Sequence, residues 1–183
     1  MKNNNKPTLT IFTPAYNRAY TLHLCYKSLL RQKNKDFEWL IVDDGSTDNT
    51  RELVEGWMKN NNEFNIRYVY KENGGMHTAH NTAYENIYTE LNMCIDSDDF
   101  ITDDAVDKII KFWSENKSDK YGGIIALDIF QNGEIIGTEL PNKKEITYHD
   151  FYEYGGKGDK KVIYRTDIMK KYPPYPEYKD EKF

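Results

Sequence analysis

The stretch WLIVDDGSTDNTRELVEGWM (residues 39–58) contains a complete strand-to-helix unit. Residues 39–42 are a short apolar run bounded by polar residues, which is typical of a buried strand. Residues 43–45, Asp-Asp-Gly, end that strand, and Ser46 or Thr47 can cap a helix. The apolar residues that follow recur at helical spacing: Leu53, Val54, Trp57 and Met58. The stretch therefore predicts a buried strand that ends in two aspartates and leads into an amphipathic helix.

The same order of elements occurs on both sides of this stretch. Further strand-like runs lie at residues 9–13, 66–70 and 91–95, the first of them stopped by Pro14. Helical patterns follow Thr21, cover residues 76–88, and begin again at Asp103 or Asp104. Strands that alternate with helices form right-handed βαβ units and a mostly parallel sheet. We therefore predict an α/β fold with a mostly parallel, twisted sheet and flanking helices.

The pattern changes after about residue 122. Two apolar runs, 124–130 and 134–138, flank an Asn-Gly pair at residues 132–133, which favours a hairpin between them. A helix at 148–154 and a strand at 162–164 are expected further on. The chain ends in a charged cluster with no closing element, so we expect it to be part of a longer protein.

Composition narrows the class of protein. The chain has 183 residues, of which 38% are hydrophobic and 30% charged, as in one ordinary globular domain. A net charge of −5 disfavours a large nucleic-acid footprint. The sequence contains neither a secretory signal nor an apolar run of the roughly 20 residues that a membrane span needs. The two cysteines lie in separate apolar stretches, which indicates a reducing compartment. We expect a cytoplasmic protein, with a peripheral position at the inner face of the membrane as an option.

Polar side chains follow three of the predicted strands. Asn17 and Arg18 follow the first, Asp43 and Asp44 the second, and the acidic run at residues 96–99 the fourth. The carboxyl ends of parallel strands meet at one edge of a sheet, where such folds bind ligands. We therefore expect these side chains to gather in one site.

The acidic run Asp96-Ser97-Asp98-Asp99 indicates a metal site. Carboxylates packed this closely repel one another, which is costly at a strand end unless a cation neutralises them. Hard oxygen ligands suit Mn²⁺ or Mg²⁺, bound together with phosphates of a substrate. The alternative is a solvated turn in which Asp98 or Asp99 caps the next helix.

Four segments in this order resemble glycosyltransferase family two, the inverting enzymes of the GT-A fold. They are TPAYNR (13–18), VDDGSTDNT (42–50), ENGG (72–75) and DSDD (96–99), and the resemblance covers residues 8–115. It implies a single GT-A-like domain over residues 1–183. Within that domain, residues 8–115 would be a Rossmann-like half that binds a nucleotide sugar, and residues 116–183 an incomplete acceptor-side half.

The resemblance also implies roles for individual residues. The positions of Pro14, Tyr16 and Asp44 line the uridine in the family, although Tyr16 could instead plug the start of a helix. Asp96 and Asp98 form the Asp-x-Asp pair that serves the ribose and the metal on the diphosphate, and Asp99 is a neighbour that shares either role. The other residues expected at the nucleotide sugar are Asn17, Arg18, Asp43, Asn73, Gly74, Gly75 and His80.

Two departures from the family concern His80 and the catalytic base. His80-Asn81 stands where many relatives have an Arg-Asn pair, and with His77 it forms an H-x-x-H pair that would need a third ligand to hold a metal. The acidic motif that supplies the base has only a loose match at Asp180-Glu181. Of these two candidates we expect Glu181, and the alternative is a solvated charge run.

The function that the resemblance implies is transfer of a sugar, with inversion, from a UDP-sugar to a hydroxyl group of a saccharide or lipid-linked acceptor. The setting would be the synthesis of cell-surface polysaccharide or glycoconjugate. One alternative is a nucleotide-binding fragment without turnover. Another is a nucleotidyltransferase, which needs a glycine-rich basic loop near the first strand, whereas residues 13–20 contain no glycine. The third alternative is a signalling receiver domain, which would need a lone phospho-accepting aspartate and no Asp-x-Asp pair.

Overall fold

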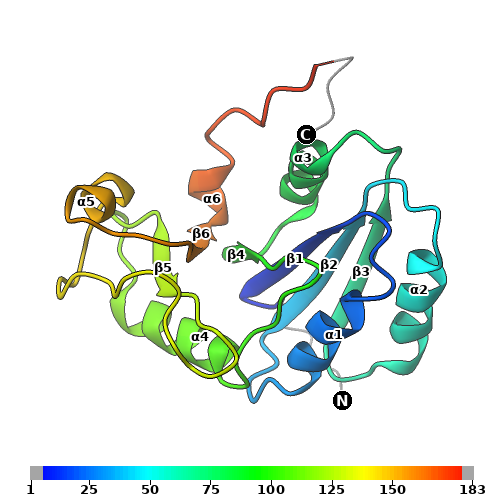
Figure 1. Cartoon of the computed structure of the whole chain (residues 1–183), viewed down its shortest axis with the longest axis horizontal. Helices are drawn as coiled ribbons and strands as arrows, with labels where there is room; N and C mark the ends of the chain where they lie inside the picture. Colours follow the sequence, from blue (N-terminus) through cyan, green and yellow to red (C-terminus); the bar gives the residue numbers. More distant parts are fainter. Residues whose placement is uncertain (1–5, 179–183) are drawn as a thin grey trace.

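The computed structural model describes residues 6–178, which form a six-stranded sheet with helices on both faces (Figure 1). The sheet has the order β3-β2-β1-β4-β6-β5. Its strands are β1 (Leu9–Ala15), β2 (Phe37–Asp43), β3 (Asn65–Tyr70), β4 (Leu91–Cys94), β5 (Gly123–Leu127) and β6 (Lys160–Arg165). The helices are α1 (Leu22–Leu30), α2 (Thr50–Asn60), α3 (Met76–Asn86), α4 (Ala105–Asn116), α5 (Tyr148–Glu153) and α6 (Thr166–Met169).

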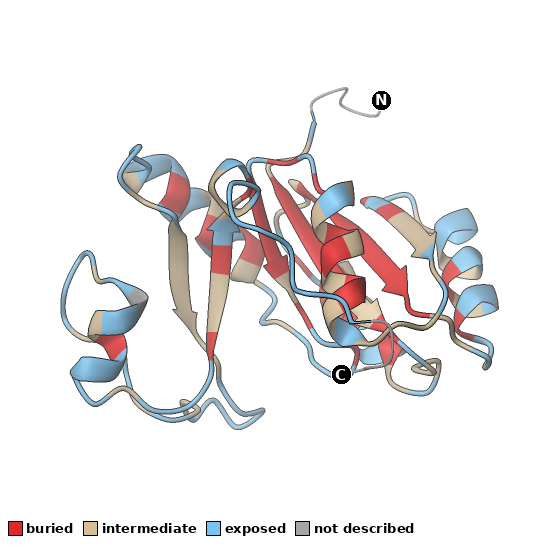
Figure 2. Cartoon of the chain, turned by 90° about the horizontal axis from the view of Figure 1, so that it is seen from above, coloured by how far each residue is buried: buried red, intermediate tan, exposed pale blue. Residues whose placement is uncertain are grey.

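The predicted parallel sheet is confirmed for the first four strands. β1 pairs in parallel with both β2 and β4, and β2 pairs in parallel with β3. Every residue of β2 is buried, as expected for a central strand covered on both faces (Figure 2). The chain then departs from this order, because β6 inserts between β4 and β5 and runs antiparallel to both.

Two apolar cores cover the two faces of the sheet. Alternate residues of a strand point to opposite faces, so Ile11 and Trp39 belong to one core and Phe12 and Leu40 to the other. The larger core also takes buried residues of α1, α2 and α4, whereas the smaller core is closed by α3 on the opposite side (Figure 1). Among the described residues, no helix is both long and apolar enough to cross a membrane.

Two predicted boundaries are wrong. Pro14 lies within β1 instead of ending the strand before it, opposite Val42 of β2. Because β4 pairs with β1 only as far as Phe12, the proline lies where β1 has a partner strand on one side only, and no second ladder is interrupted. α2 begins at Thr50 and has Asn49 at its N-cap, later than a cap at Ser46 or Thr47 would place it, because residues 44–48 are held in a loop.

The predicted hairpin between residues 124–130 and 134–138 is also largely wrong. The Asn-Gly turn does form, and Phe130 N donates a hydrogen bond of 2.8 Å to Glu134 O. The second arm, however, makes only an isolated bridge between Ile129 and Ile135. β5 pairs with β6 instead, so pairing with a strand far away in the sequence prevails over the local turn signal.

Candidate functional site

Four segments meet at the edge of the sheet where the parallel strands end, as the strand order predicts (Figure 1). Tyr16 and its neighbours follow β1, Asp44 follows the last residue of β2, residues 71–75 follow β3, and residues 96–99 lie just after β4. The topology therefore brings together the segments that sequence reasoning selected.

Asp44 organises the loop that follows β3. Its side chain is only 4% exposed. Oδ1 accepts hydrogen bonds from Lys71 Nζ (2.7 Å) and Gly74 N (3.0 Å). Oδ2 accepts from Asn73 Nδ2 (3.1 Å) and Gly75 N (2.8 Å). Both carboxylate oxygens are thus fully engaged, and the aspartate fixes the backbone of residues 73–75 at the start of α3.

Glycine is required at two positions of this loop. Gly75 has a φ of +95°, in the region that favours glycine, and α3 begins at the next residue. A Cβ at Gly74 would come within 2.7 Å of Thr78 Oγ1. The Asn-Gly-Gly sequence therefore lets the chain turn tightly from β3 into α3 and presents its backbone at the edge of the sheet.

Asp43 has a structural role. It is 1% exposed, its Oδ1 accepts a hydrogen bond of 2.8 Å from Ser46 N, and Tyr68 Oη donates to its Oδ2. A carboxylate that is buried and bonded through both oxygens stabilises the turn after β2. We therefore do not carry Asp43 forward as a ligand for a nucleotide sugar.

Asn17 and Arg18 join the loops that follow β1 and β2. Asn17 has a φ of +53°, and its Oδ1 accepts hydrogen bonds from the backbone amides of Thr47 (2.8 Å) and Asp48 (3.2 Å). Arg18 Nη1 donates to Tyr20 Oη at 2.8 Å, on the surface. The side chain of Asn17 is thus used inside the protein, and a ligand-binding role for either residue stays a prediction.

Tyr16 and Pro14 remain accessible beside these loops. Tyr16 is 47% exposed, and Pro14 is half-buried at the end of β1. Among the described aromatic residues, none is in ring contact with Tyr16. Plugging of a helix start by this ring is therefore not seen, and almost half of Tyr16 is accessible to a ligand.

The acidic run after β4 forms an exposed turn. Asp99 N donates to Asp96 O at 3.1 Å, Asp96, Asp98 and Asp99 are exposed, and Ser97 is buried beneath them. Partial desolvation of its carboxyl group raises the pKa of Asp99, the ammonium of Lys161 opposes that shift, and the carboxylates of Asp96 and Asp98 add to it. The turn therefore concentrates negative charge at the edge of the sheet.

Sequence reasoning missed Asp128 and Lys161, which extend this charged region. Asp128 follows β5, and Lys161 of β6 is paired with the β5 residue Ala126. Burial raises the pKa of Asp128, the ammonium of Lys161 opposes that shift, and the carboxylates of Asp159 and Asp96 add to it. The sequence signal that could have identified Asp128 is an aspartate directly after an apolar strand, the same pattern as at Asp43 and Asp96.

The donor set fits a hard divalent cation shared with a ligand. Among residues 6–178, no group of three His, Cys, Asp or Glu side chains could hold a metal ion alone, which also argues against the H-x-x-H pair as a metal site. Mg²⁺ in phosphate sites is bound through one or two carboxylates together with substrate phosphates and waters. Exposed aspartates with a raised pKa at Asp99 match that arrangement.

His80 is half-buried on α3 and packs against aromatic rings. Its ring contacts Phe12 and Tyr84 edge-on, with ring centroids 5.3 and 5.9 Å away, and Nε2 is 4.0 Å from Cys94 Sγ. Burial lowers the pKa of His80, which favours the neutral imidazole, and the carboxylate of Asp96 opposes that shift. A direct contact between His80 and a nucleotide stays a prediction.

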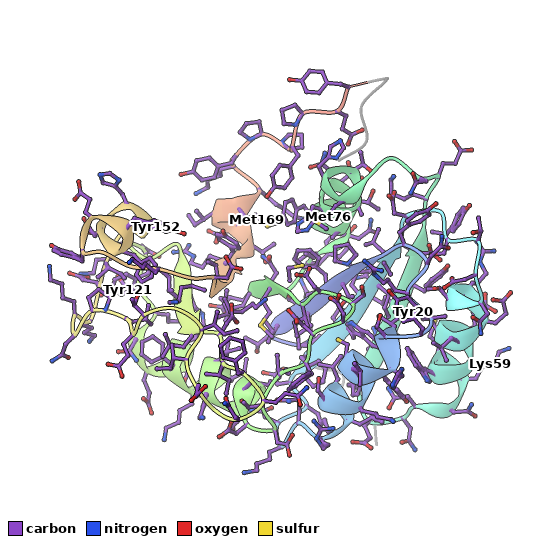
Figure 3. The ribbon with its side chains drawn as sticks, viewed as in Figure 1. Tyr20, Lys59, Met76, Tyr121, Tyr152 and Met169 are labelled. Carbon is purple, nitrogen blue, oxygen red and sulfur yellow. The ribbon has the colours of Figure 1, made fainter. Side chains whose placement is uncertain are left out.

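Two tyrosines of the later part of the chain lie away from this site. Tyr121 and Tyr152 lie at the opposite end of the molecule from Tyr20, which follows β1 (Figure 3). The predicted bases, Asp180 and Glu181, lie outside the described residues.

Comparison with known proteins decides the family. A sequence model of the family Glycosyl transferase family 2 matches residues 10–172, most of the chain. The chain belongs to glycosyltransferase family 2. Hyaluronan synthase of Pasteurella multocida is 36% identical over 115 residues, which are 63% of this chain and 12% of that protein. The putative teichuronic acid biosynthesis glycosyltransferase TuaG of Bacillus subtilis is 33% identical over 112 residues, 61% of this chain and 44% of that protein.

Solved glycosyltransferases share the fold. TarS of S. aureus (residues 1–349), solved in complex with UDP-GlcNAc, has a TM-score of 0.64 and 25% identity, and the match covers 90% of this chain and 47% of that chain. The mannosyltransferase PcManGT of Pyrobaculum calidifontis, in complex with GDP-Man and Mn²⁺, has a TM-score of 0.68 and 18% identity over 94% of this chain and 48% of that chain. The predicted GT-A fold is thus confirmed. This family 2 chain spans less than half the length of each of the four proteins.

Proposed function

We propose that this family 2 chain binds a UDP-sugar and transfers the sugar, with inversion, to a hydroxyl group of a saccharide or lipid-linked acceptor. The product would be a cell-surface polysaccharide or glycoconjugate. The observation that carries the proposal is that three features meet at one edge of the sheet: Tyr16, the loop of residues 73–75 that Asp44 holds, and the Asp96–Asp99 turn. We call the second of these the Asp44-held loop. The polysaccharide setting is supported by the likeness to hyaluronan synthase and TuaG.

The donor nucleotide would lie across the ends of β1, β2 and β4. The exposed ring of Tyr16 offers a stacking surface for uracil, with Pro14 beside it. The backbone of Gly74 and Gly75 offers polar groups that Asp44 holds in place. UDP, and not another nucleotide, is favoured by the likeness to TarS in complex with UDP-GlcNAc.

Asp96 and Asp98, with Asp99 beside them, are the residues that would hold Mn²⁺ or Mg²⁺. A divalent cation bound there supplies positive charge that offsets the negative charge of the diphosphate. Without it, these carboxylates and the diphosphate repel each other. The role of the three aspartates is therefore to hold and orient the donor.

The transfer step is a single displacement. The acceptor hydroxyl oxygen bonds to the anomeric carbon on the face opposite the diphosphate, the bond from that carbon to the diphosphate oxygen breaks, and UDP leaves. A carboxylate takes the hydroxyl proton during the attack. We assign this role to Glu181, with Asp180 as the second candidate and Asp159 as the next. Glu181→Gln should remove transfer and leave UDP binding unchanged.

The test is a thermal-shift screen of UDP, GDP, CDP and dTDP sugars with Mn²⁺. We expect a rise in Tm with UDP-sugars that clearly exceeds the rise with the other nucleotides. Release of UDP from the stabilising donor would separate an enzyme from a binding fragment without turnover. A larger shift with another nucleotide, or none with any, would contradict the proposal.

A further inference from the structure

The side chain of Asn81 clasps a segment near the end of the described chain. Asn81 Oδ1 accepts a hydrogen bond of 2.8 Å from Tyr175 N, and its Nδ2 donates to Tyr175 O at 2.9 Å. The same Nδ2 donates to Glu177 Oε1 at 2.7 Å. We call this set of contacts the Asn81 clasp. It joins residues that are 94 and 96 positions apart in the sequence.

The clasp is specific because the amide is buried. Asn81 is only 6% exposed, and a buried amide without hydrogen-bond partners is costly. The segment that contains Tyr175 satisfies both amide hydrogens of Nδ2 and the oxygen. The tyrosine ring adds packing: it stacks on Tyr84 with ring centroids 6.3 Å apart, and it meets His80 edge-on at 5.8 Å.

The clasp connects the proposed donor site with the segment that precedes the predicted catalytic base. Asn81 lies on α3, which begins directly after the Asp44-held loop at the proposed donor site. Glu177 precedes the predicted bases, Asp180 and Glu181, by three and four residues in the sequence. α6 and the segment that follows it lie on the same side of the sheet as α3 (Figures 1 and 3). The buried amide of Asn81 therefore joins α3, which follows the proposed donor loop, to the segment that precedes the predicted bases in the sequence.

We propose that Asn81 is a positioning residue for sugar transfer, which holds the segment of Tyr175 and Glu177 in register with the donor site. This inference rests on the proposed function and adds to it a residue that contacts neither the donor nor the acceptor. Its effect should appear in the rate of transfer and not in donor binding, because misplacing a reacting group slows the chemical step while ground-state binding persists.

The test compares Asn81→Asp with the wild-type chain. The substitution is nearly isosteric, but it replaces the donor Nδ2 with an oxygen that faces Tyr175 O and Glu177 Oε1. Tyr175→Pro is the second variant, which removes the backbone N–H from the other side of the clasp in a segment outside the core. Asn86→Asp is the matched control, because Asn86 lies on the same helix and its Nδ2 bonds only Thr82 O, within the helix.

The Kd for UDP with Mn²⁺, and the kcat and KM for UDP release from UDP-GlcNAc, are measured for each protein. Hydrogen exchange of peptides that contain Tyr175 is measured for the wild-type chain, Asn81→Asp and Asn86→Asp. In Asn81→Asp, exchange of the Tyr175 amide should be about tenfold faster, since the clasp that protects it is weakened. In both clasp variants the kcat should fall on the order of 10–100-fold. The Kd and KM should stay within about twofold of wild type, as should all values for Asn86→Asp.

The outcomes separate this inference from the proposed function. If the wild-type chain does not bind UDP, the proposed function fails, while hydrogen exchange still reports on the clasp. Unchanged exchange of the Tyr175 amide in Asn81→Asp would overturn the clasp itself. Faster exchange with an unchanged kcat would overturn the positioning role, and so would a wild-type chain that binds UDP but releases none from UDP-GlcNAc.

Discussion

Lys71 Nζ lies 2.7 Å from Asp44 Oδ1, and this ion pair joins the segments that follow β3 and β2. The lysine side chain is largely buried, and its ammonium also donates to Thr78 Oγ1 at 2.7 Å, in the first turn of α3. Two strand ends and one helix start are therefore fixed by a single carboxylate–ammonium contact. This contact sets the shape of the loop that we assign to the nucleotide sugar.

Asp44→Asn should destabilise the protein and weaken UDP binding. The substitution removes the charge that Lys71 pairs with and places an NH₂ group against backbone donors. We expect a loss of about 3 kcal/mol in the free energy of unfolding, measured by urea denaturation, because breaking a buried pair leaves one charge without its partner. Asp103→Asn is the control, since the Arg31–Asp103 pair is half-exposed and should contribute less than about 1 kcal/mol. Equal losses in the two variants would contradict this role of Asp44.

Tyr16→Ala should weaken UDP binding without a change in stability. Stacking of a base on an aromatic ring contributes about 1–3 kcal/mol where it has been measured. Phe112→Ala is a matched control, because Phe112 is as exposed as Tyr16, at 47%, and lies on α4 away from the site. Isothermal titration calorimetry with UDP gives the Kd of both variants. An unchanged Kd in Tyr16→Ala would remove this ring from the site.

Asp98→Asn should abolish cation-dependent UDP binding and leave the Tm of the free protein within about a degree of wild type. An exposed carboxylate in a turn contributes little packing, so its loss should affect the ligand alone. The control is Asp107→Asn, which removes an exposed carboxylate from α4. Unfolding of Asp98→Asn, with normal folding of the control, would show that Asp98 has a structural role.

Asp128→Asn should stabilise the protein at neutral pH. Because burial raises the pKa of Asp128, this carboxyl contributes stability that is present below its ordinary value of 3.8 and is lost as the pH rises through the raised pKa. Asparagine is neutral at every pH, so the gain in the free energy of unfolding should be larger at pH 7 and shrink below pH 3.8. Urea denaturation at both pH values tests this. An Asp128→Asn variant with a lower free energy of unfolding than wild type at pH 7 would contradict the predicted direction of the change.

The part of the fold and site that could be predicted depends on local patterns. The run Trp39–Val42 before Asp43-Asp44, and the run before Asp96, predict buried strands that end in carboxylates. Parallel strands end at one edge, so the meeting of these aspartates follows from the strand pattern and the connection rules alone.

The rest depends on contacts that no local pattern specifies. The Asn-Gly turn at residues 132–133 favoured a hairpin, but β5 pairs with β6, which also brings Lys161 next to the acidic region. The hydrogen bonds of Asn17 Oδ1 to backbone amides 30 and 31 residues away could not be predicted from the local sequence, and its role as a ligand stays a prediction. His80 is covered because Tyr175 folds back onto α3, a contact that only the complete topology reveals.

The most direct test of donor binding through the acidic turn is the affinity of the wild-type chain for UDP with and without a divalent cation. Titration in Mn²⁺ or Mg²⁺ should give saturable binding, and UDP at 100 times its Kd should stabilise the fold by about 2.7 kcal/mol. In EDTA, repulsion between the diphosphate and the Asp96–Asp99 turn should remove most of this binding. Equal affinity in EDTA and in Mn²⁺ would contradict the account.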